Sequence, residues 1–143
     1  MGEPKDPARD SRTVLVVEDE EVLRRVVQRF LEHEGYTVRT AADGVEALRV
    51  LREQDGHVDL VLTDVMLPRM NGPALGRQLA MEWPRTLVLF MSGYSNDDVF
   101  RDGLLDEATP IIRKPFDLEE LAHAVRDALD GALAGQLRME RSA

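Results

Sequence analysis

The sequence predicts an α/β protein, a doubly wound parallel sheet of five strands with five helices. Five short apolar runs alternate with segments of helical periodicity, and every connection between runs is long enough for a crossover helix. The apolar runs are also continuous, as in strands that are buried on both faces. With 143 residues, the chain has about the length of one domain of roughly 100–200 residues.

Composition and charge exclude several classes of protein. The chain has no cysteine, which excludes disulfides and thiolate zinc sites. Its formal net charge of -9 repels nucleic acid phosphates, and no cluster of Lys and Arg offsets it, so we expect no direct binding of nucleic acid. No apolar run reaches the roughly 18–20 residues of a membrane helix, and residues 1–12 lack the apolar core of an export signal. We therefore expect a soluble, cytoplasmic protein without membrane insertion.

The first strand is predicted over residues 13–17, after a polar leader at residues 1–11 that we expect to be flexible. The β-branched residues of this strand give way abruptly to four consecutive acids, Glu18 to Glu21. These acids open a helix that Gly35 ends. Apolar residues recur at helical spacing and predict one buried face of this helix: Val22, Leu23, Val26, Val27, Phe30 and Leu31.

The second strand, at residues 36–41, is more polar, as expected at the edge of a sheet. Asp43 then caps a helix whose third position is Glu46, in a capping-box arrangement. Three residues form the predicted buried stripe of this helix: Val45, Leu48 and Leu51. The third strand lies in the apolar run 58–67, which ends at a proline and carries Asp64 near its end.

The next part of the chain repeats this pattern. Pro73 lies in the first turn of a third helix, whose apolar residues are Leu75, Leu79 and Ala80. The fourth strand, at residues 87–91, runs into Ser92. Ser95, with Asp98 three residues later, resembles the cap of a short fourth helix.

The last strand and helix complete the predicted fold. The strand is the short pair Ile111-Ile112, and Asp117 with Glu120 predicts the cap of the helix that follows. The apolar stripe of this helix comprises Leu118, Leu121, Val125, Leu129 and Leu133. We place one domain at residues 12–134 and expect residues 135–143 to form a flexible tail.

Polar residues that could carry chemistry stand at the ends of four predicted strands. They comprise three carboxylates, one hydroxyl and one ammonium: Glu18 and Asp19 after the first strand, Asp64 at the third, Ser92 at the fourth and Lys114 at the fifth. In a parallel sheet these ends lie at one edge, where ligands bind in such folds. Clustered carboxylates repel one another unless a cation neutralises them. Oxygen ligands without His or Cys point to Mg²⁺.

A phosphoryl group would suit this edge. Mg²⁺ and Lys114 would neutralise its oxygens, Asp64 would be the nucleophile and Ser92 a hydrogen-bond donor. Each residue also has a simpler interpretation, because acids stabilise a helix N-terminus, Asp64 or Ser92 could lie in a turn, and a lone lysine is usually solvated. Their joint occurrence at four strand ends favours a site.

These motifs resemble those of the receiver domains of two-component response regulators, such as the chemotaxis receiver. The resemblance covers residues 12–134 and rests on five motifs: Glu18-Asp19, Leu62-Thr63-Asp64-Val65-Met66-Leu67-Pro68, Met70-Asn71-Gly72, Ser92-Gly93 and Lys114-Pro115-Phe116. It implies the flavodoxin-like receiver fold, with strand order 2-1-3-4-5. It also implies a phosphoprotein that serves in signal transduction.

The resemblance implies a role for each residue of the phosphorylation site. Asp64 would accept a phosphoryl group from the phosphohistidine of a histidine kinase or a phosphotransfer protein. Lys114 would hold a phosphoryl oxygen, and Ser92 would move toward the phosphate as a switch. The family commonly has a cis peptide bond before the proline of its Lys-Pro pair, here Lys114-Pro115. Only roughly 5–6% of X-Pro bonds are cis in general.

The resemblance also implies a Mg²⁺ site. Asp19 and Asp64 would bind the ion directly, Glu18 would bind it through water, and Met66 would bind it through its backbone carbonyl. Mg²⁺ is therefore the expected cofactor.

The chain departs from the family pattern in two places. Many receivers have Tyr or Phe three residues before the lysine, where this chain has Ile111, so the aromatic form of the switch cannot operate here. The two positions that tune hydrolysis in the family are Met66 and Tyr94, and neither carries an amide or acid that would orient water. We therefore expect a comparatively long-lived phosphoaspartate.

Two other functions remain open at this level. A phosphohydrolase with an aspartyl nucleophile typically has a second carboxylate two residues later, where this chain has Met66. A phosphate-independent interaction module would not need the acid pocket with Ser92 and Lys114. We expect a signalling domain that catalyses only its own phosphorylation and dephosphorylation. Because the sequence has no room for an effector domain after the last helix, we expect its output to pass to a protein partner.

Overall fold

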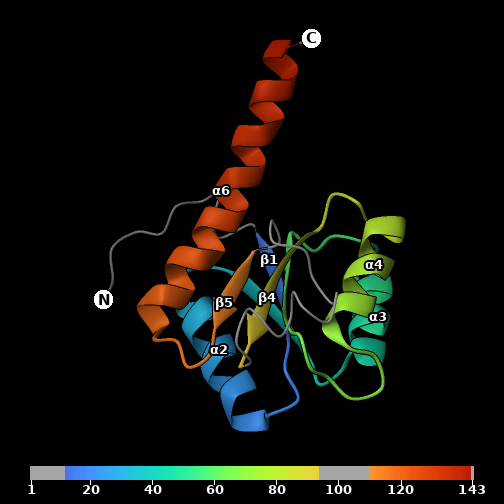
Figure 1. Ribbon diagram of the computed structural model, residues 1–143, viewed down its shortest axis with the longest axis vertical. Helices are drawn as coiled ribbons and strands as arrows, with labels where there is room; N and C mark the ends of the chain where they lie inside the picture. Colours follow the sequence, from blue (N-terminus) through green and yellow to red (C-terminus); the bar gives the residue numbers. More distant parts are fainter. Residues whose placement is uncertain (1–11, 94–109, 143) are drawn as a thin grey trace.

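The computed structural model describes residues 12–93 and 110–142, with side chains up to residue 131. Strands and helices alternate through most of this part of the chain (Figure 1). In chain order they are β1 (Thr13–Val17), α2 (Glu21–His33), β2 (Thr37–Ala41), α3 (Gly44–Glu53), β3 (Leu60–Asp64), α4 (Gly72–Glu82), β4 (Leu87–Ser92), β5 (Ile111–Arg113) and α6 (Leu118–Ser142).

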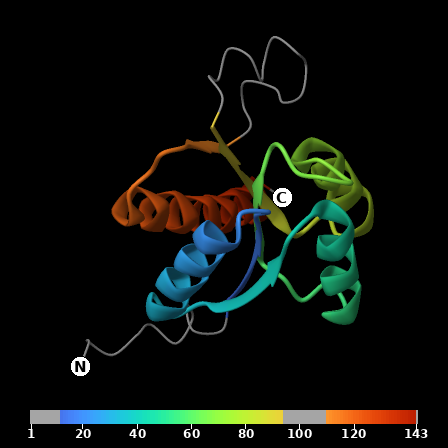
Figure 2. The same cartoon turned by 90° about the horizontal axis from the view of Figure 1, so that it is seen from below.

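The five strands form one parallel sheet in the order β2-β1-β3-β4-β5, which confirms the predicted fold class and strand order. The sheet lies between two layers of helices, with α2 and α6 on one face and α3 and α4 on the other (Figure 2). The register pairs Val17 with Thr63 and Asp64 with Met91. The carboxyl ends of β1, β3 and β4 therefore lie level with one another at one edge of the sheet.

Each face of the sheet has its own hydrophobic core. Alternate residues of the central strands supply the two cores, because successive side chains of a strand point to opposite faces. Leu62 packs with α2 and α6 residues such as Leu31 and Val125, whereas Val61 packs with α3 and α4 residues such as Leu51 and Leu79. Strand β3 is buried along its whole length, which explains its continuous apolar sequence.

The predicted helix starts are confirmed by their hydrogen bonds. The Asp43 carboxylate accepts from the Glu46 amide at 2.8 Å, and the Asp117 carboxylate accepts from the Glu120 amide at 2.7 Å. Pro73 lies in the first turn of α4 as predicted. These caps satisfy amides that the first turn of a helix leaves without partners.

The predicted buried faces of the helices were partly wrong. The buried stripe of α2 contains Val27 and Leu31, but Val22 is 71% exposed and Val26 is 44% exposed. In α3, Val45 is 42% exposed, and Leu118 at the start of α6 is 40% exposed. Ala80 in α4 is exposed as well. Helical spacing is satisfied by more than one stripe when apolar residues are adjacent, so spacing alone does not select the buried one.

Two predicted features lie at or beyond the ends of the described segments. The fourth helix expected after Ser95 lies outside the described residues, and so does Tyr94; the described part contains four helices. Helix α6 continues to Ser142, past residue 134 where we placed the end of the domain, and this boundary stays a prediction. Among the described helices, none combines the length and the apolar character needed to cross a lipid bilayer.

Candidate phosphorylation and metal site

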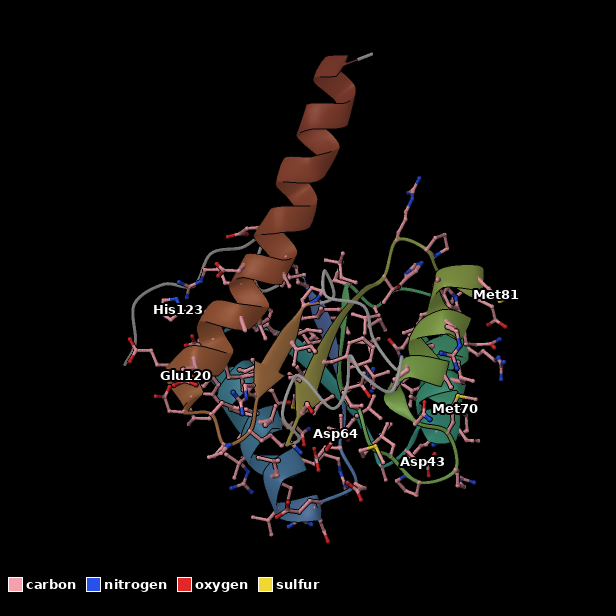
Figure 3. All side chains as sticks on the ribbon, viewed as in Figure 1. Asp43, Asp64, Met70, Met81, Glu120 and His123 are labelled. Atoms are coloured by element: carbon pink, nitrogen blue, oxygen red, sulfur yellow. The ribbon has the colours of Figure 1, made fainter. Side chains whose placement is uncertain are left out.

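The structure brings the predicted site residues together at the carboxyl edge of the sheet. Strand β3 ends at Asp64 and β4 ends at Ser92, while Glu18 directly follows β1 and Lys114 directly follows β5. Asp64 lies at this edge in Figure 3. Glu18 is 1% exposed, Asp64 is 7% exposed and Ser92 is 1% exposed. Such burial is unusual for carboxylates, which are rarely buried unless they are paired.

Lys114 is the partner of both buried carboxylates. Its Nζ donates to Asp64 Oδ2 at 2.6 Å and to Glu18 Oε2 at 2.8 Å. The backbone of Lys114 is tied to β4 as well, because its amide donates to the Ser92 carbonyl at 2.8 Å. The Lys114–Pro115 peptide bond is cis, as the family resemblance implied.

The pKa values at this edge reflect one ammonium shared between two acids. Burial and the neighbouring Asp64 raise the pKa of Glu18 to about 7, although the hydrogen bond from Lys114 opposes the rise. Burial lowers the pKa of Lys114, but its bonds to Asp64 and Glu18 outweigh this, so its pKa lies above the ordinary value. Lys114 therefore stays an ammonium, and Glu18 gains or loses a proton near neutral pH.

The loop after β1 is held by hydrogen bonds that involve both backbone and side-chain groups. The Glu18 amide donates to the Ala41 carbonyl at 3.1 Å, and the Glu20 amide donates to Glu18 Oε1 at 3.2 Å. Arg24, one turn into α2, donates from Nη1 to the Glu18 carbonyl at 2.9 Å. Arg24 was not among the predicted site residues, and its place within the apolar pattern of α2 gave no signal for this contact.

The β3–α4 loop, residues 65–71, begins directly at Asp64. The Met66 amide donates to Asp64 Oδ1 at 3.2 Å, and the Gly72 amide donates to the Val65 carbonyl at 2.9 Å. A Cβ on Gly72 would overlap the Asp64 carbonyl oxygen, so this helix start must be a glycine to fit against the strand end. The Met66 side chain points outward, and the residue is 50% exposed.

The donors at this edge fit a hard divalent cation. One carboxylate oxygen from each of Glu18, Asp19 and Asp64 lies within 4.8 Å of the other two. Asp19 is exposed while the other two are buried, which leaves the group open to solvent on one side. Mg²⁺ takes only a few protein carboxylates and keeps several waters, so a partly open set of three acids matches its preference.

The proposed switch residues lie on neighbouring strands. Ser92 pairs with Arg113, and Ile111 pairs with Phe90 two residues before Ser92. Ile111 is half-buried at the edge strand β5.

Asp43 and Arg69 form a contact that the sequence analysis missed. Arg69 lies in the β3–α4 loop, and its Nε and Nη2 donate to the two oxygens of Asp43 at 2.9 Å and 3.1 Å. We predicted Asp43 only as the cap of α3. The two residues are 26 positions apart, and no local pattern links them.

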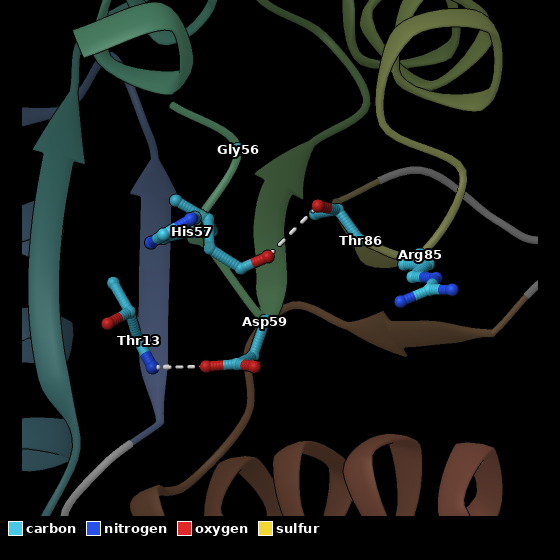
Figure 4. A pocket seen from close by; sticks show the side chains of 7 residues that line it. Thr13, Gly56, His57, Asp59, Arg85 and Thr86 are labelled. Atoms are coloured by element: carbon cyan, nitrogen blue, oxygen red, sulfur yellow. Dashed lines mark hydrogen bonds between the residues drawn. The ribbon is translucent and has the colours of Figure 1, made fainter. Parts of the chain in front are cut away.

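The described residues also line one pocket beside this group and another far from it. An apolar pocket lined by Leu23, Gly93 and the Lys114–Phe116 segment adjoins the carboxyl edge. The other lies at the opposite edge, where strands β1, β3 and β4 begin (Figure 4). There the Asp59 carboxylate accepts from the Thr13 amide at 2.7 Å and Thr86 Oγ1 donates to the Val58 carbonyl at 2.9 Å, so these groups tie strand starts together.

Comparisons with known proteins agree with this geometry. A family model for the response regulator receiver domain matches residues 14–126. The chain is 43% identical over 120 residues to the sensor kinase CckA of Brucella abortus. The matched segment covers 84% of this chain and 13% of that kinase. It spans about half the length of other curated relatives that it matches.

Two solved structures illustrate the likeness in three dimensions. The receiver domain of the hybrid histidine kinase CckA has a TM-score of 0.69 and 35% identity, covering 82% of this chain and 98% of that one. The chemotaxis protein CheY4 of Vibrio cholerae has a TM-score of 0.73 and 31% identity, again covering 82% of this chain and 98% of that one.

Proposed function

Because this chain belongs to the response regulator receiver family, whose members are signalling domains of two-component systems, we propose that Asp64 is its phospho-acceptor. The donor is the phosphohistidine of a histidine kinase or a phosphotransfer protein, and the reaction requires Mg²⁺. The domain catalyses only its own phosphorylation and dephosphorylation, and its output passes to a protein partner.

The observation that carries this proposal is the pair of contacts from Lys114 Nζ to Asp64 and Glu18, at 2.6 Å and 2.8 Å. They place an ammonium beside the oxygen that would attack phosphorus. A carboxylate oxygen of Asp64 forms the new P–O bond while the P–N bond to the donor imidazole breaks, and the imidazole leaves with the electron pair. Lys114 Nζ then turns from the carboxylate to a phosphoryl oxygen and neutralises its charge.

The acids of this edge would hold the metal ion. Asp19 and Asp64 would contribute carboxylate oxygens, Glu18 would act through water, and Met66 would contribute its backbone carbonyl. When bound, the ion neutralises negative charge on the phosphoryl oxygens. Glu18 must lose its proton to take part, and its pKa of about 7 makes this step dependent on pH near neutrality.

Ser92 and Ile111 are the proposed switch. Ser92 stands at the end of β4, one strand away from Asp64, and would donate from its hydroxyl to a phosphoryl oxygen. Ile111, opposite Phe90, would transmit the movement through packing at the sheet edge. An aliphatic residue has no ring to turn inward, so a change of populations in the surrounding loops would carry the signal.

Labelling with a small phosphodonor tests the proposal. We expect Mg²⁺ and acetyl phosphate to add one phosphoryl group, seen by intact-protein mass spectrometry, and we expect Asp64→Asn to abolish it. Asp127→Asn removes an exposed carboxylate on α6 and is the matched control, with labelling unchanged. Sustained hydrolysis of unrelated phosphoesters would instead favour a phosphohydrolase, and an unlabelled wild-type protein would favour a phosphate-independent interaction module.

Met66 and Tyr94 are proposed to slow the loss of the phosphoryl group. The exposed Met66 side chain offers no group that orients an attacking water next to Asp64. We expect the double variant Met66→Asn, Tyr94→Glu to lose phosphate about ten times faster, measured as the decay of labelled protein after the donor is removed. A variant with the wild-type decay rate would contradict this role.

A further inference from the structure

We propose that the ion pair between Arg69 and Asp43 is a clamp that positions the β3–α4 loop, and with it the Met66 carbonyl, for Mg²⁺ binding. The inference rests on the proposed function, because it assigns a positioning role at the same site. Arg69 and Asp43 touch neither the phosphoryl group nor the metal ion in this proposal. They act through the backbone of the loop.

The Arg69–Asp43 ion pair has a well-defined geometry. Arg69 donates through Nε and Nη2 to both oxygens of Asp43, at 2.9 Å and 3.1 Å, in a two-pronged contact. Such contacts fix orientation as well as distance. Most exposed ion pairs contribute little to stability. Here, however, the Asp43 side chain is only 12% exposed, so the carboxylate of this pair is shielded from water.

Asp43 is itself immobilised by α3. Its Oδ1 accepts the Glu46 amide at 2.8 Å, and the Glu46 carboxylate accepts the Ala42 amide at 3.2 Å. Burial raises the pKa of Asp43, but the Glu46 amide and the Arg69 guanidinium outweigh this and hold its pKa below the ordinary value. Arg69 therefore binds a charged group that the first turn of a helix holds in place.

The backbone of the loop shows what the clamp maintains. Arg69 has a φ of 64°, in the left-handed region that residues with a Cβ adopt rarely. Next to it, the Met70 carbonyl packs so closely on α3 that a Cβ at Gly44 would lie 2.6 Å from its oxygen. The loop is thus pressed against α3 in an uncommon conformation, and the side chain of Arg69 is bonded to the same turn of α3.

The loop connects this contact directly to the site. Met66, whose carbonyl is the proposed metal ligand, lies three residues before Arg69, and its amide already donates to Asp64 Oδ1 at 3.2 Å. The other end of the loop is fixed by the bond from the Gly72 amide to the Val65 carbonyl. The clamp therefore restrains the middle of a loop whose two ends are tied at Asp64 and α4. A ligand held in this way loses less freedom on binding the ion.

Substitution of Arg69 distinguishes a positioning role from a purely electrostatic one, because the two predict opposite changes in Mg²⁺ affinity. If charge alone matters, removing a positive charge should strengthen cation binding at the three carboxylates. If Arg69 is a clamp, Arg69→Gln should weaken Mg²⁺ binding roughly tenfold, the scale seen for groups that position metal ligands. Arg69→Lys keeps the charge but not the two-pronged contact, so it should also weaken binding.

The matched control is Arg52→Gln. Arg52 lies near the far end of α3, its side chain is 59% exposed, as is that of Arg69, and it faces Glu82 at 3.8 Å. This variant loses the same charge without touching the loop. Asp43→Asn keeps an oxygen for the helix cap and removes the ion pair. Combined with Arg69→Gln, it should weaken binding no further than either change alone.

Three measurements on the full chain test the clamp. Calorimetric titration with Mg²⁺ gives the affinity, and the Mg²⁺ concentration at half-maximal labelling by acetyl phosphate gives its effect on the reaction. Amide hydrogen exchange of residues 65–71 in metal-free protein reports the loop itself. We expect faster exchange in Arg69→Gln than in Arg52→Gln.

The outcomes distinguish this inference from the proposed function. Equal or tighter Mg²⁺ binding in Arg69→Gln than in Arg52→Gln, or unchanged exchange of the loop, would overturn the clamp. A wild-type protein that takes no label, or an Asp64→Asn protein that still takes it, would overturn the proposed function instead. In that case, the exchange measurement on metal-free protein still decides whether the loop is clamped.

Discussion

Lys114 is the cation that partly neutralises the carboxyl edge, because its ammonium group contacts two buried carboxylates. Its bonds to Asp64 and Glu18 keep the pKa of the lysine high, yet they do not prevent burial from raising the pKa of Glu18 to about 7. In metal-free protein near neutral pH, the edge therefore carries more carboxylates than one lysine can neutralise. A divalent cation would neutralise this excess negative charge.

The raised pKa of Glu18 predicts a pH-dependent stability. The pKa is raised from 4.5 to about 7 in the folded protein, so between these values the folded state binds more protons and stability falls as pH rises. Glu18→Gln cannot ionise. In the presence of a chelator, it should be more stable than wild type at pH 8 by on the order of 2 kcal/mol, and little different at pH 5.

Urea denaturation at the two pH values measures this difference. The single tryptophan of the chain, Trp83, packs against Gly56, away from the carboxylates of the candidate site. Its fluorescence reports unfolding. Asp127→Asn serves again as a control for general charge effects. A stability gain of the same size at pH 5 and pH 8 would show that Glu18 does not titrate in this range.

At the scale of elements, β3 and α4 meet at a tightly packed junction. Gly72 begins α4 directly against the end of β3, where a Cβ would overlap the Asp64 carbonyl oxygen. Gly131, in α6, has nothing within 4 Å of the position its Cβ would take. Close packing thus requires a glycine at position 72, whereas position 131 has room for a side chain.

This contrast predicts opposite effects of the same substitution. Gly72→Ala forces the strand end and the helix apart and should destabilise the protein by roughly 2 kcal/mol or more. Gly131→Ala should stabilise it by about 0.5–1 kcal/mol, because alanine loses less conformational freedom in a helix. Urea denaturation checks both, and a stabilising effect of Gly72→Ala would contradict the close approach.

The elements also show where sequence patterns are sufficient and where they are not. The five strands were predicted because β-branched, continuous apolar runs have few alternatives, and the helix caps because their chemistry is local. The buried faces of α2 and α3 were not, since Val22, Val26 and Val45 satisfy helical spacing yet face solvent. Which apolar stripe is buried depends on how a helix lies on the sheet, and that is set by the whole packing.

At the scale of the molecule, the sheet order brings distant acids to one edge, and this predicts that a divalent cation stabilises the fold. Mg²⁺ at ten times its dissociation constant should raise the free energy of unfolding by about 1.4 kcal/mol. Asp19→Asn should remove most of this gain, since Asp19 is exposed and its loss does not disturb the core. Thermal unfolding with and without Mg²⁺, at ionic strength matched with sodium chloride, measures the effect.

The composition of the candidate site could be predicted because topology is restrictive. Once the strands were parallel, the residues at their carboxyl ends had to meet, and Glu18, Asp64 and Lys114 do meet. The pair of Arg69 and Asp43 could not be predicted, because it joins two loops whose relative placement depends on how α3 packs on the sheet. The same holds for Arg24, whose contact is with a backbone carbonyl.

Helix α6 extends well beyond the rest of the described domain. It starts four residues after Lys114, and its 25 residues make it roughly 38 Å long at 1.5 Å per residue. Its far end projects beyond the sheet, away from the edge that carries Asp64 (Figures 1 and 3). A tilt of about 10° at the base of such a rod displaces its tip by roughly 6 Å. A small change in the direction of α6 beside Lys114 would therefore give a larger displacement on the opposite side of the molecule.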